Sequence, residues 1–264
     1  MDKIRLENLT LIYEDEKGGF APFEKVNLSV KEGEFVCMIG PSGCGKSSLL
    51  SVIEGLNKAS SGAVYIDEKK IEGPGTERGV VFQHYSLFPW MDATHNITFA
   101  MKQSKYKGTR KEMLERAEYY LDKVGLGDAK KKYPSQLSGG MQQRVAIARL
   151  MASNADIFLM DEPFGAVDPK NRSALQEMIS RLSKEEKKTV LFVTHDIEEA
   201  ILLSDRILFL GDKDIQADIE VELERPRTKE KLIGSQEFVQ LHKQLMNLFY
   251  KSMAEKIGME KIMI

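Results

Sequence analysis

The residues Gly40-Pro41-Ser42-Gly43-Cys44-Gly45-Lys46-Ser47 match the pattern G-x-x-x-x-G-K-[ST] in full. In this pattern, glycines let backbone N–H groups wrap a phosphate, and the following helix adds its positive N-terminal end. Lys46 is expected to reach the β- and γ-phosphates, and the Ser47 hydroxyl to ligate Mg²⁺. The sequence therefore predicts a nucleoside triphosphate site, made by Gly40, Ser42, Gly43, Gly45, Lys46, Ser47 and Ser48.

The flanking sequence supplies the context that a phosphate loop requires. Residues 34–39 form a short, almost continuous apolar run, which is typical of a strand buried on both faces. Helix-forming residues follow the loop over 46–54. Because a strand precedes the loop and a helix follows it, a chance glycine turn is the weaker interpretation.

The first third of the chain also carries strand patterns. Residues 4–13 and 25–30 alternate in part between apolar and polar side chains, so they predict antiparallel strands with a turn over 17–22. Two further short strands are expected at 63–66 and 79–82. These patterns predict an antiparallel β subdomain in addition to the strand, loop and helix described above.

Helical patterns dominate from about residue 94 to 150. Their clearest start is a capping box, in which Thr109 and Glu112 satisfy each other's backbone N–H groups. An alternation of strands and helices then resumes. Strands are expected at 156–160, 189–194 and 206–210, and helices at 169–186 and 196–204.

The predicted fold class is therefore α/β, with a parallel core, an antiparallel β subdomain and a helical insertion subdomain. We expect one domain over residues 1–220, in which the helical subdomain occupies about 90–152. A helical C-terminal tail is expected over 221–264. Its apolar stripe consists of Phe238, Leu241, Leu245 and Leu248.

Two carboxylates, Asp161 and Glu162, follow the apolar run 157–160. Ligands gather at the carboxyl ends of parallel strands, so this pair is expected to face the phosphates. Asp161 is placed to hold Mg²⁺, directly or through water, and Glu162 to polarise a water for in-line attack on the γ-phosphate. The alternative is a solvated strand end, which the upstream phosphate loop disfavours.

A second helix start is predicted by Leu137-Ser138-Gly139-Gly140-Met141-Gln142-Gln143-Arg144. A hydroxyl and exposed backbone N–H groups at a helix N-terminus form an anion site. One chain would then hold two phosphate-binding helix starts, about a hundred residues apart. A head-to-tail pair of chains could place both on one nucleotide, with Ser138 and Gly140 contributing from the second chain.

With these motifs, residues 1–210 resemble the ABC ATPase family, whose P-loop NTPase core carries a signature that usually ends Leu-Ser-Gly-Gly-Gln. Met141 stands here in place of that glutamine. The resemblance implies ATP and Mg²⁺ as cofactors. It further implies that Tyr13 stacks on adenine, that Gln83 senses Mg²⁺ and the attacking water, that Asp168 crosses a dimer interface and that His195 contacts the γ-phosphate. Glu162, Gln83 and His195 would be catalytic, and Ser47, Gln83 and Asp161 would hold the metal.

The composition excludes several other classes of protein. Lys and Arg number 38 against 40 Asp and Glu, whereas a nucleic-acid binder usually shows a basic excess. No apolar run approaches the roughly 18 residues that span a bilayer, and the charged N-terminus predicts no signal peptide. Two cysteines, Cys37 and Cys44, favour a reducing compartment over a disulfide framework. The composition therefore predicts that any place at a membrane is peripheral, and the resemblance to ABC ATPases implies the cytoplasmic face of the cell membrane.

The segment 84–91, His-Tyr-Ser-Leu-Phe-Pro-Trp-Met, resembles the family region that grips a helix of a membrane subunit. The alternative is that its aromatic side chains only seat the helical insertion on the core. Phe88-Pro89-Trp90, Met141 and the short tail are similar to ATPases of nitrate, sulfonate and taurine importers. This resemblance implies a second copy or a paralogous ATPase, integral membrane permease subunits and, indirectly, an extracytoplasmic substrate-binding protein.

Two other uses of the same fold stay open at this point. A soluble ABC clamp or assembly factor would be expected to carry a long coiled-coil insertion, or two cassettes with a basic face. A regulatory partner that binds ATP without cleaving it would be expected to lose Glu162 or His195, and both are present. The sequence names neither the transported solute nor the choice between homodimer and heterodimer.

Overall fold

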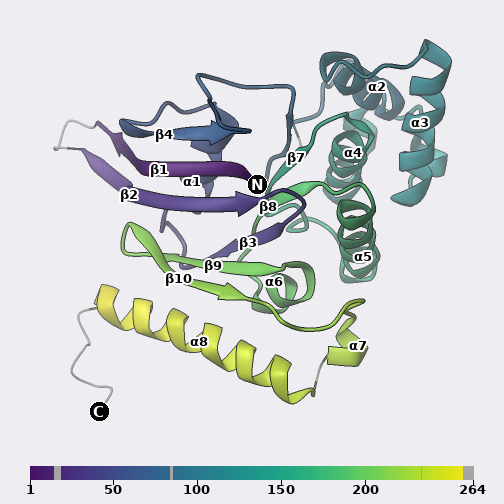
Figure 1. Ribbon diagram of the computed structural model, residues 1–264. Coiled ribbons are helices and arrows are strands. Elements are labelled where there is room, and N and C mark those ends of the chain that lie inside the picture. The colour runs from purple at the N-terminus through teal and green to yellow at the C-terminus, as the bar shows by residue number, and fades with distance from the viewer. Residues whose placement is uncertain (15–18, 84–85, 233, 258–264) are drawn as a thin grey trace. The chain divides into compact units, whose positions relative to one another are not determined.

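The computed structural model describes residues 1–14, 19–83, 86–232 and 234–257. The chain divides into two compact units, which are described separately (Figure 1). The first unit consists of Met1–Pro74 with Lys187–Ile264, and the second of Gly75–Glu186. In the described part of the chain, no helix is both long and apolar enough to cross a membrane. The predicted domain boundaries were drawn from sequence motifs, and these two units are defined by contacts, so the boundaries stay a prediction.

An antiparallel sheet of four strands, in the order β2-β1-β4-β5, opens the first unit. Its strands are β1 (Asp2–Tyr13), β2 (Phe20–Lys31), β4 (Ser61–Ile66) and β5 (Lys69–Lys70). The turn predicted over 17–22 is wrong for residues 20–22, because Phe20 pairs with Tyr13 and extends the hairpin. Pro22 is tolerated there because β2 is an edge strand. Residues 17 and 18 lie outside the described residues.

The first unit also holds a run of mostly parallel strands. Strand β3 (Phe35–Ile39) pairs in parallel with β8 (Thr189–Val193) on one side and with β9 (Arg206–Gly211) on the other. All five residues of β3 are buried, as the continuous apolar run predicts. The strand β10 (Asp214–Glu220) pairs antiparallel with β9 and was not predicted. Helices α1 (Lys46–Glu54) and α6 (Ile197–Leu203) connect these strands to the rest of the unit.

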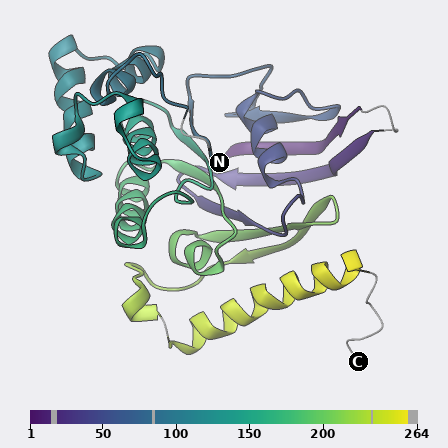
Figure 2. The same ribbon diagram turned by 180° about the vertical axis from the view of Figure 1, so that it is seen from behind.

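The C-terminal part of the first unit forms α7 (Lys229–Leu232) and α8 (Gln236–Ile257). Both views show α8 running beside the β9–β10 hairpin (Figures 1 and 2). Leu245 is fully buried, and the Phe249 ring meets Phe209 of β9 edge-on, with centroids 5.0 Å apart. Of the predicted apolar stripe, Phe238 and Leu245 are buried against the chain's own core, whereas Leu241 and Leu248 are half-buried. The predicted helical tail over 221–264 is wrong at its start, because residues 221–228 are not helical and Pro226 removes a backbone donor.

The second unit joins a parallel strand pair to a helical layer. Strand β6 (Arg78–Val81) pairs with β7 (Ile157–Asp161). The helices are α2 (Ala93–Gln103), α3 (Arg110–Lys123), α4 (Gly139–Ala152) and α5 (Pro169–Glu185), with short 3-10 turns at Gly127–Ala129 and Pro134–Gln136. The predicted capping box is confirmed, since the Thr109 side chain accepts from the Glu112 N–H and Glu112 accepts from the Thr109 N–H. Fully buried Ile97, Ala117 and Val145 pack α2, α3 and α4 together.

Candidate active site

The predicted phosphate loop follows β3 directly and ends at the N-cap of α1. Gly40 has φ +151°, and a Cβ there would lie 2.2 Å from the backbone oxygen of Leu210, so only glycine fits. The ammonium of Lys46 donates to the backbone oxygens of Gly40, at 2.8 Å, and Pro41, at 2.9 Å. The loop is thus closed around its own lysine, and the α1 N-terminus lies directly beside it.

Tyr13 lies against the first turn of α1. Its hydroxyl donates to the Ser48 Oγ at 3.4 Å and accepts from the Asn57 side-chain amide at 3.2 Å. The side chain is 41% exposed, so its ring keeps a solvent-facing surface. The structure therefore brings Tyr13 to the helix that carries Ser47 and Ser48. Asn57 was missed, because a single amide after a helix has no recognisable sequence pattern.

His195 belongs to the same unit and lies at the same sheet edge as the phosphate loop. Strands β3 and β8 run parallel, with Met38 beside Val193, so their carboxyl ends coincide. The backbone N–H of Thr194 donates to the oxygen of Met38 at 3.2 Å. The next residue along the chain is His195, whose side chain is exposed to solvent. An exposed imidazole beside a phosphate loop can contact the terminal phosphate of a bound nucleotide.

A second group of predicted residues meets in the other unit. Strands β6 and β7 run parallel with Val81 beside Met160, so the segments that follow them share an edge. There the Gln83 side-chain amide donates to the Glu162 Oε2 at 3.4 Å. Glu162 has φ +44°, a left-handed conformation that costs about 1–3 kcal/mol in a residue with a side chain. Such strain is often found at functional sites, and here it falls on the first residue after β7.

The signature motif forms the N-terminus of α4, as predicted. The Ser138 hydroxyl is the N-cap and accepts a hydrogen bond from the Met141 N–H at 3.3 Å. Because this bond uses only the backbone of Met141, it does not depend on the side chain at that position. A Cβ on Gly140 would lie 2.8 Å from the backbone oxygen of Ala166. The signature therefore sits against the loop that leads to Asp168. Ser138 itself stays exposed.

Asp168, at the end of that loop, is exposed and forms the N-cap of α5 (Pro169–Glu185). Its carboxylate accepts from the Asn171 backbone N–H at 3.1 Å and from the Asn171 side-chain amide at 2.7 Å. These bonds, the side-chain one first, lower the pKa of Asp168. The carboxylate therefore stays ionised at neutral pH.

An aromatic patch, made by Phe88, Trp90 and Phe99, covers the segment before α2. The Phe88 ring contacts Trp90, with centroids 5.5 Å apart, and Phe99, with centroids 4.8 Å apart. Phe88 is half-buried, while Trp90 is 69% exposed and lines a surface pocket with Tyr133. Phe88 thus packs the segment against α2, whereas most of the Trp90 side chain faces solvent. His84 and Tyr85 of the predicted segment lie outside the described residues.

The predicted metal ligands are all oxygen donors, namely the Ser47 hydroxyl, the Gln83 amide and the Asp161 carboxylate. Mg²⁺ prefers such donors and is commonly held by one or two carboxylates together with substrate phosphates. Among the described residues, no group of three or more His, Cys, Asp or Glu side chains could hold a metal by itself. This donor set fits Mg²⁺ that arrives with a nucleotide and does not fit a protein-only metal cage.

Comparison with known proteins identifies the family. A family model described as "ABC transporter" matches residues 23–165, a span that includes both the phosphate loop and the signature. The chain belongs to the ABC transporter family. An ABC transporter ATP-binding protein of Methanocaldococcus jannaschii is 44% identical over 249 residues, which cover 93% of this chain and 91% of the relative.

Two further ABC relatives carry more specific names. The nitrate import ATP-binding protein NrtD of Synechococcus elongatus is 41% identical and covers 90% of this chain and 88% of its own length. The bicarbonate transport ATP-binding protein CmpD of the same organism is 39% identical, covering 94% and 91%. The ATP-binding cassette MJ0796, solved as a dimer bound to ADP and phosphate, is 36% identical, with a TM-score of 0.78 over 84% of this chain and all of that one.

These findings confirm the predicted family and the α/β ABC ATPase fold. The protein is an ABC ATPase, which binds ATP and couples its hydrolysis to transport. The predicted site residues fall into two groups, one in each unit. The first unit brings together Tyr13, the phosphate loop and His195. The second brings together Gln83 and Glu162, and places Gly140 of the signature against the loop that leads to Asp168.

Proposed function

We propose that this ABC ATPase drives an importer, in which it pairs head to tail with a second copy or a paralogous ATPase around two ATP molecules. The observation that carries the proposal is the similarity to a nitrate import ATP-binding protein and a bicarbonate transport ATP-binding protein, over at least 88% of both chains in each case. The transported solute would be small, such as nitrate, sulfonate or taurine. The proposal accounts for a chain with two anion-binding helix starts, each of which serves a different nucleotide.

The phosphates would bind to the N–H groups of residues 40–48 and to the Lys46 ammonium. That ammonium now donates to two loop carbonyls, which it would exchange for phosphate oxygens. Tyr13 would stack on adenine. Ser138 and Gly140 of the partner subunit would close the site from the other side, so a single subunit would hydrolyse ATP poorly.

Hydrolysis would follow closure of the dimer. Glu162 polarises a water for in-line attack on the γ-phosphate, and the Gln83 amide orients the Glu162 carboxylate. His195 contacts the γ-phosphate from the edge of β8. Mg²⁺, held by Ser47, Asp161 and Gln83, would neutralise charge on the phosphates. Every protein group in this scheme lies at the carboxyl end of a parallel strand or at a helix N-terminus.

The aromatic patch would receive a helix of a membrane permease. An exposed tryptophan over a pocket with polar edges is typical of an interface anchor, and Trp90 has this setting. Bound in this way, the ATPase would be peripheral, on the cytoplasmic face of the cell membrane. Choice of solute would belong to the permease and to an extracytoplasmic binding protein, and nucleic acid would have no part.

Co-purification from native membranes tests the importer proposal. The tagged wild-type protein, extracted in mild detergent, is expected to retain a polytopic membrane protein at about equal stoichiometry. Trp90→Ala should lose it. Tyr119→Ala, which removes an aromatic side chain 51% exposed on α3 of the same unit, is the matched control and should retain it. Recovery of soluble partners alone would move the protein to the class of soluble ABC clamps.

A further inference from the structure

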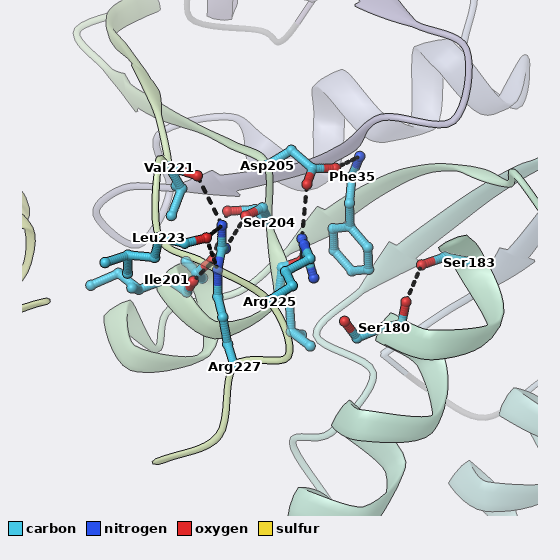
Figure 3. A network of polar contacts seen from close by, with 12 residues as sticks. Phe35, Ser180, Ser183, Ile201, Ser204, Asp205, Val221, Leu223, Arg225 and Arg227 are labelled. Carbon is cyan, nitrogen blue, oxygen red and sulfur yellow. Dashed lines mark hydrogen bonds and ion pairs between the residues drawn. The ribbon is translucent and has the colours of Figure 1, made fainter. Parts of the chain in front are cut away.

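Arg227 ties the segment after β10 to the C-terminal end of α6 (Figure 3). Its guanidinium donates to the backbone oxygens of Ile201, at 3.0 Å, and Ser204, at 2.5 Å. It also donates to Val221, at 2.8 Å, and twice to Leu223, at 3.0 and 2.8 Å. All five N–H groups are thus bonded to four carbonyls. Two of these carbonyls belong to the last turn and cap of α6, where the helix carries partial negative charge.

The setting of Arg227 is costly for a cation. Burial is the main cause that lowers the pKa of Arg227, to about 10, and the charge of Arg225 lowers it further. The side chain still carries its charge at neutral pH, held by backbone dipoles. Because every N–H of the planar guanidinium is bonded, it fixes both the distance and the angle between the segments whose carbonyls it binds. A flexible lysine ammonium cannot do this.

Arg225 strengthens the same junction (Figure 3). It donates to the backbone oxygen of Leu203 at 2.7 Å and to the Asp205 Oδ1 at 2.9 Å. The other oxygen of Asp205 accepts from the Phe35 N–H at 2.9 Å, at the first residue of β3. The end of α6 is therefore anchored to the strand that leads into the phosphate loop.

The other end of α6 holds the turn that carries His195. Asp196 is the N-cap and accepts from the Glu199 N–H at 3.1 Å. The Thr194 hydroxyl donates to the Glu199 carboxylate at 2.5 Å and accepts from the Asp196 N–H at 3.1 Å. The residues on both sides of His195 are thus bonded to each other and to α6. A seven-residue helix is only about 10 Å long, and its backbone hydrogen bonds link the turn at one end to the turn at the other.

We propose that Arg227 is a positioning residue for His195. By clamping the C-terminal end of α6, it fixes the turn from which His195 reaches the γ-phosphate, so the segment after the sheet controls the rate of hydrolysis. This inference rests on the role proposed above for His195. It assigns a function to a part of the chain outside every nucleotide-binding motif.

Arg227→Lys tests the inference, because it keeps the charge and loses the fork. We expect kcat for ATP hydrolysis to fall at least about tenfold, while KM and the ATP dissociation constant stay within about twofold. Phe249→Ala is the control for a merely loosened tail, since it removes the ring that packs on Phe209. It should lower the melting temperature and keep kcat. Equal loss of kcat in both variants, or wild-type kcat in Arg227→Lys, would overturn the inference.

A second readout does not need activity. The imidazole resonance of His195, assigned with His195→Ala, should shift in Arg227→Lys and stay in place in Phe249→Ala. An unmoved resonance in Arg227→Lys overturns the inference. In the His195→Ala background, Arg227→Lys should change single-turnover hydrolysis less than about twofold, because it acts through the missing residue. A further loss of about tenfold there would show a route that bypasses His195, and so contradict the inference.

The same variants separate this inference from the proposed function. If His195→Ala alone hydrolyses ATP at the wild-type rate, the role proposed for His195 is wrong, and the inference fails with it. If His195→Ala is inactive and Arg227→Lys is fully active with an unmoved resonance, only the positioning role of Arg227 fails.

Discussion

The side-chain amide of Gln83 donates to the Glu162 carboxylate over 3.4 Å, which joins the segments that follow two parallel strands. Glu162 sits there in a left-handed backbone conformation, at φ +44°. The contact gives the carboxylate a defined orientation. The residue expected to polarise the attacking water therefore has a strained backbone and a side chain held by a hydrogen bond.

The strained backbone at Glu162 predicts that glycine and alanine at this position differ in stability, although neither supports hydrolysis. Glu162→Gly should be more stable than Glu162→Ala by about 1 kcal/mol, because glycine adopts a positive φ without a steric cost. Both variants should lose hydrolysis. Urea unfolding of the two proteins measures the difference, and equal midpoints would show that the backbone is not strained at this position.

Two glycines of the phosphate loop should respond differently to alanine. A Cβ on Gly40 would collide with the Leu210 oxygen at 2.2 Å, so Gly40→Ala should cost about 3 kcal/mol or more. Gly43 has no atom within 4 Å of such a Cβ, and Gly43→Ala should cost about 1–2 kcal/mol from its φ of +75° alone. Thermal unfolding with and without ATP compares them. A larger loss for Gly43→Ala would contradict the loop geometry.

Acid should remove the contribution of the Thr109–Glu112 capping box. Hydrogen bonds from the Thr109 backbone and hydroxyl lower the pKa of Glu112 from 4.5. The ionised form therefore stabilises the fold above pH 4.5, and this contribution is lost as the pH falls through the lowered folded pKa. Glu112→Gln should unfold at lower urea than wild type at pH 7, and the gap should close in acid. A gap independent of pH would exclude the carboxylate as its source.

Much of the geometry of the candidate site could be predicted, because its residues lie where general rules place them. The phosphate loop is a local pattern, and Gln83 meets Glu162 because the ends of neighbouring parallel strands coincide. Glu199 was missed, although its spacing of three from Asp196 is that of a capping pair.

Other parts of the structure left no pattern to follow. Strand β10 pairs through its backbone and alternates exposed with half-buried side chains, so no apolar run marks it. Arg227 binds four backbone carbonyls, and carbonyl acceptors leave no trace in a sequence. Residue 227 was predicted to be helical. It is not, because Pro226 disfavours a helix and the Arg227 side chain binds carbonyls of other segments.

Nucleotide-driven dimerisation of Glu162→Gln tests the central claim most directly. With ATP and Mg²⁺, light scattering should show a dimer that holds two ATP molecules and does not hydrolyse them, because the substitution keeps the proposed phosphate contacts and removes the proposed base. Adding Lys46→Ala, which removes the proposed phosphate contact, or Ser138→Arg, which blocks the proposed contact from the partner's signature, should leave a monomer. A Glu162→Gln protein that hydrolyses ATP at the wild-type rate, or that dimerises equally with either added substitution, would contradict the account.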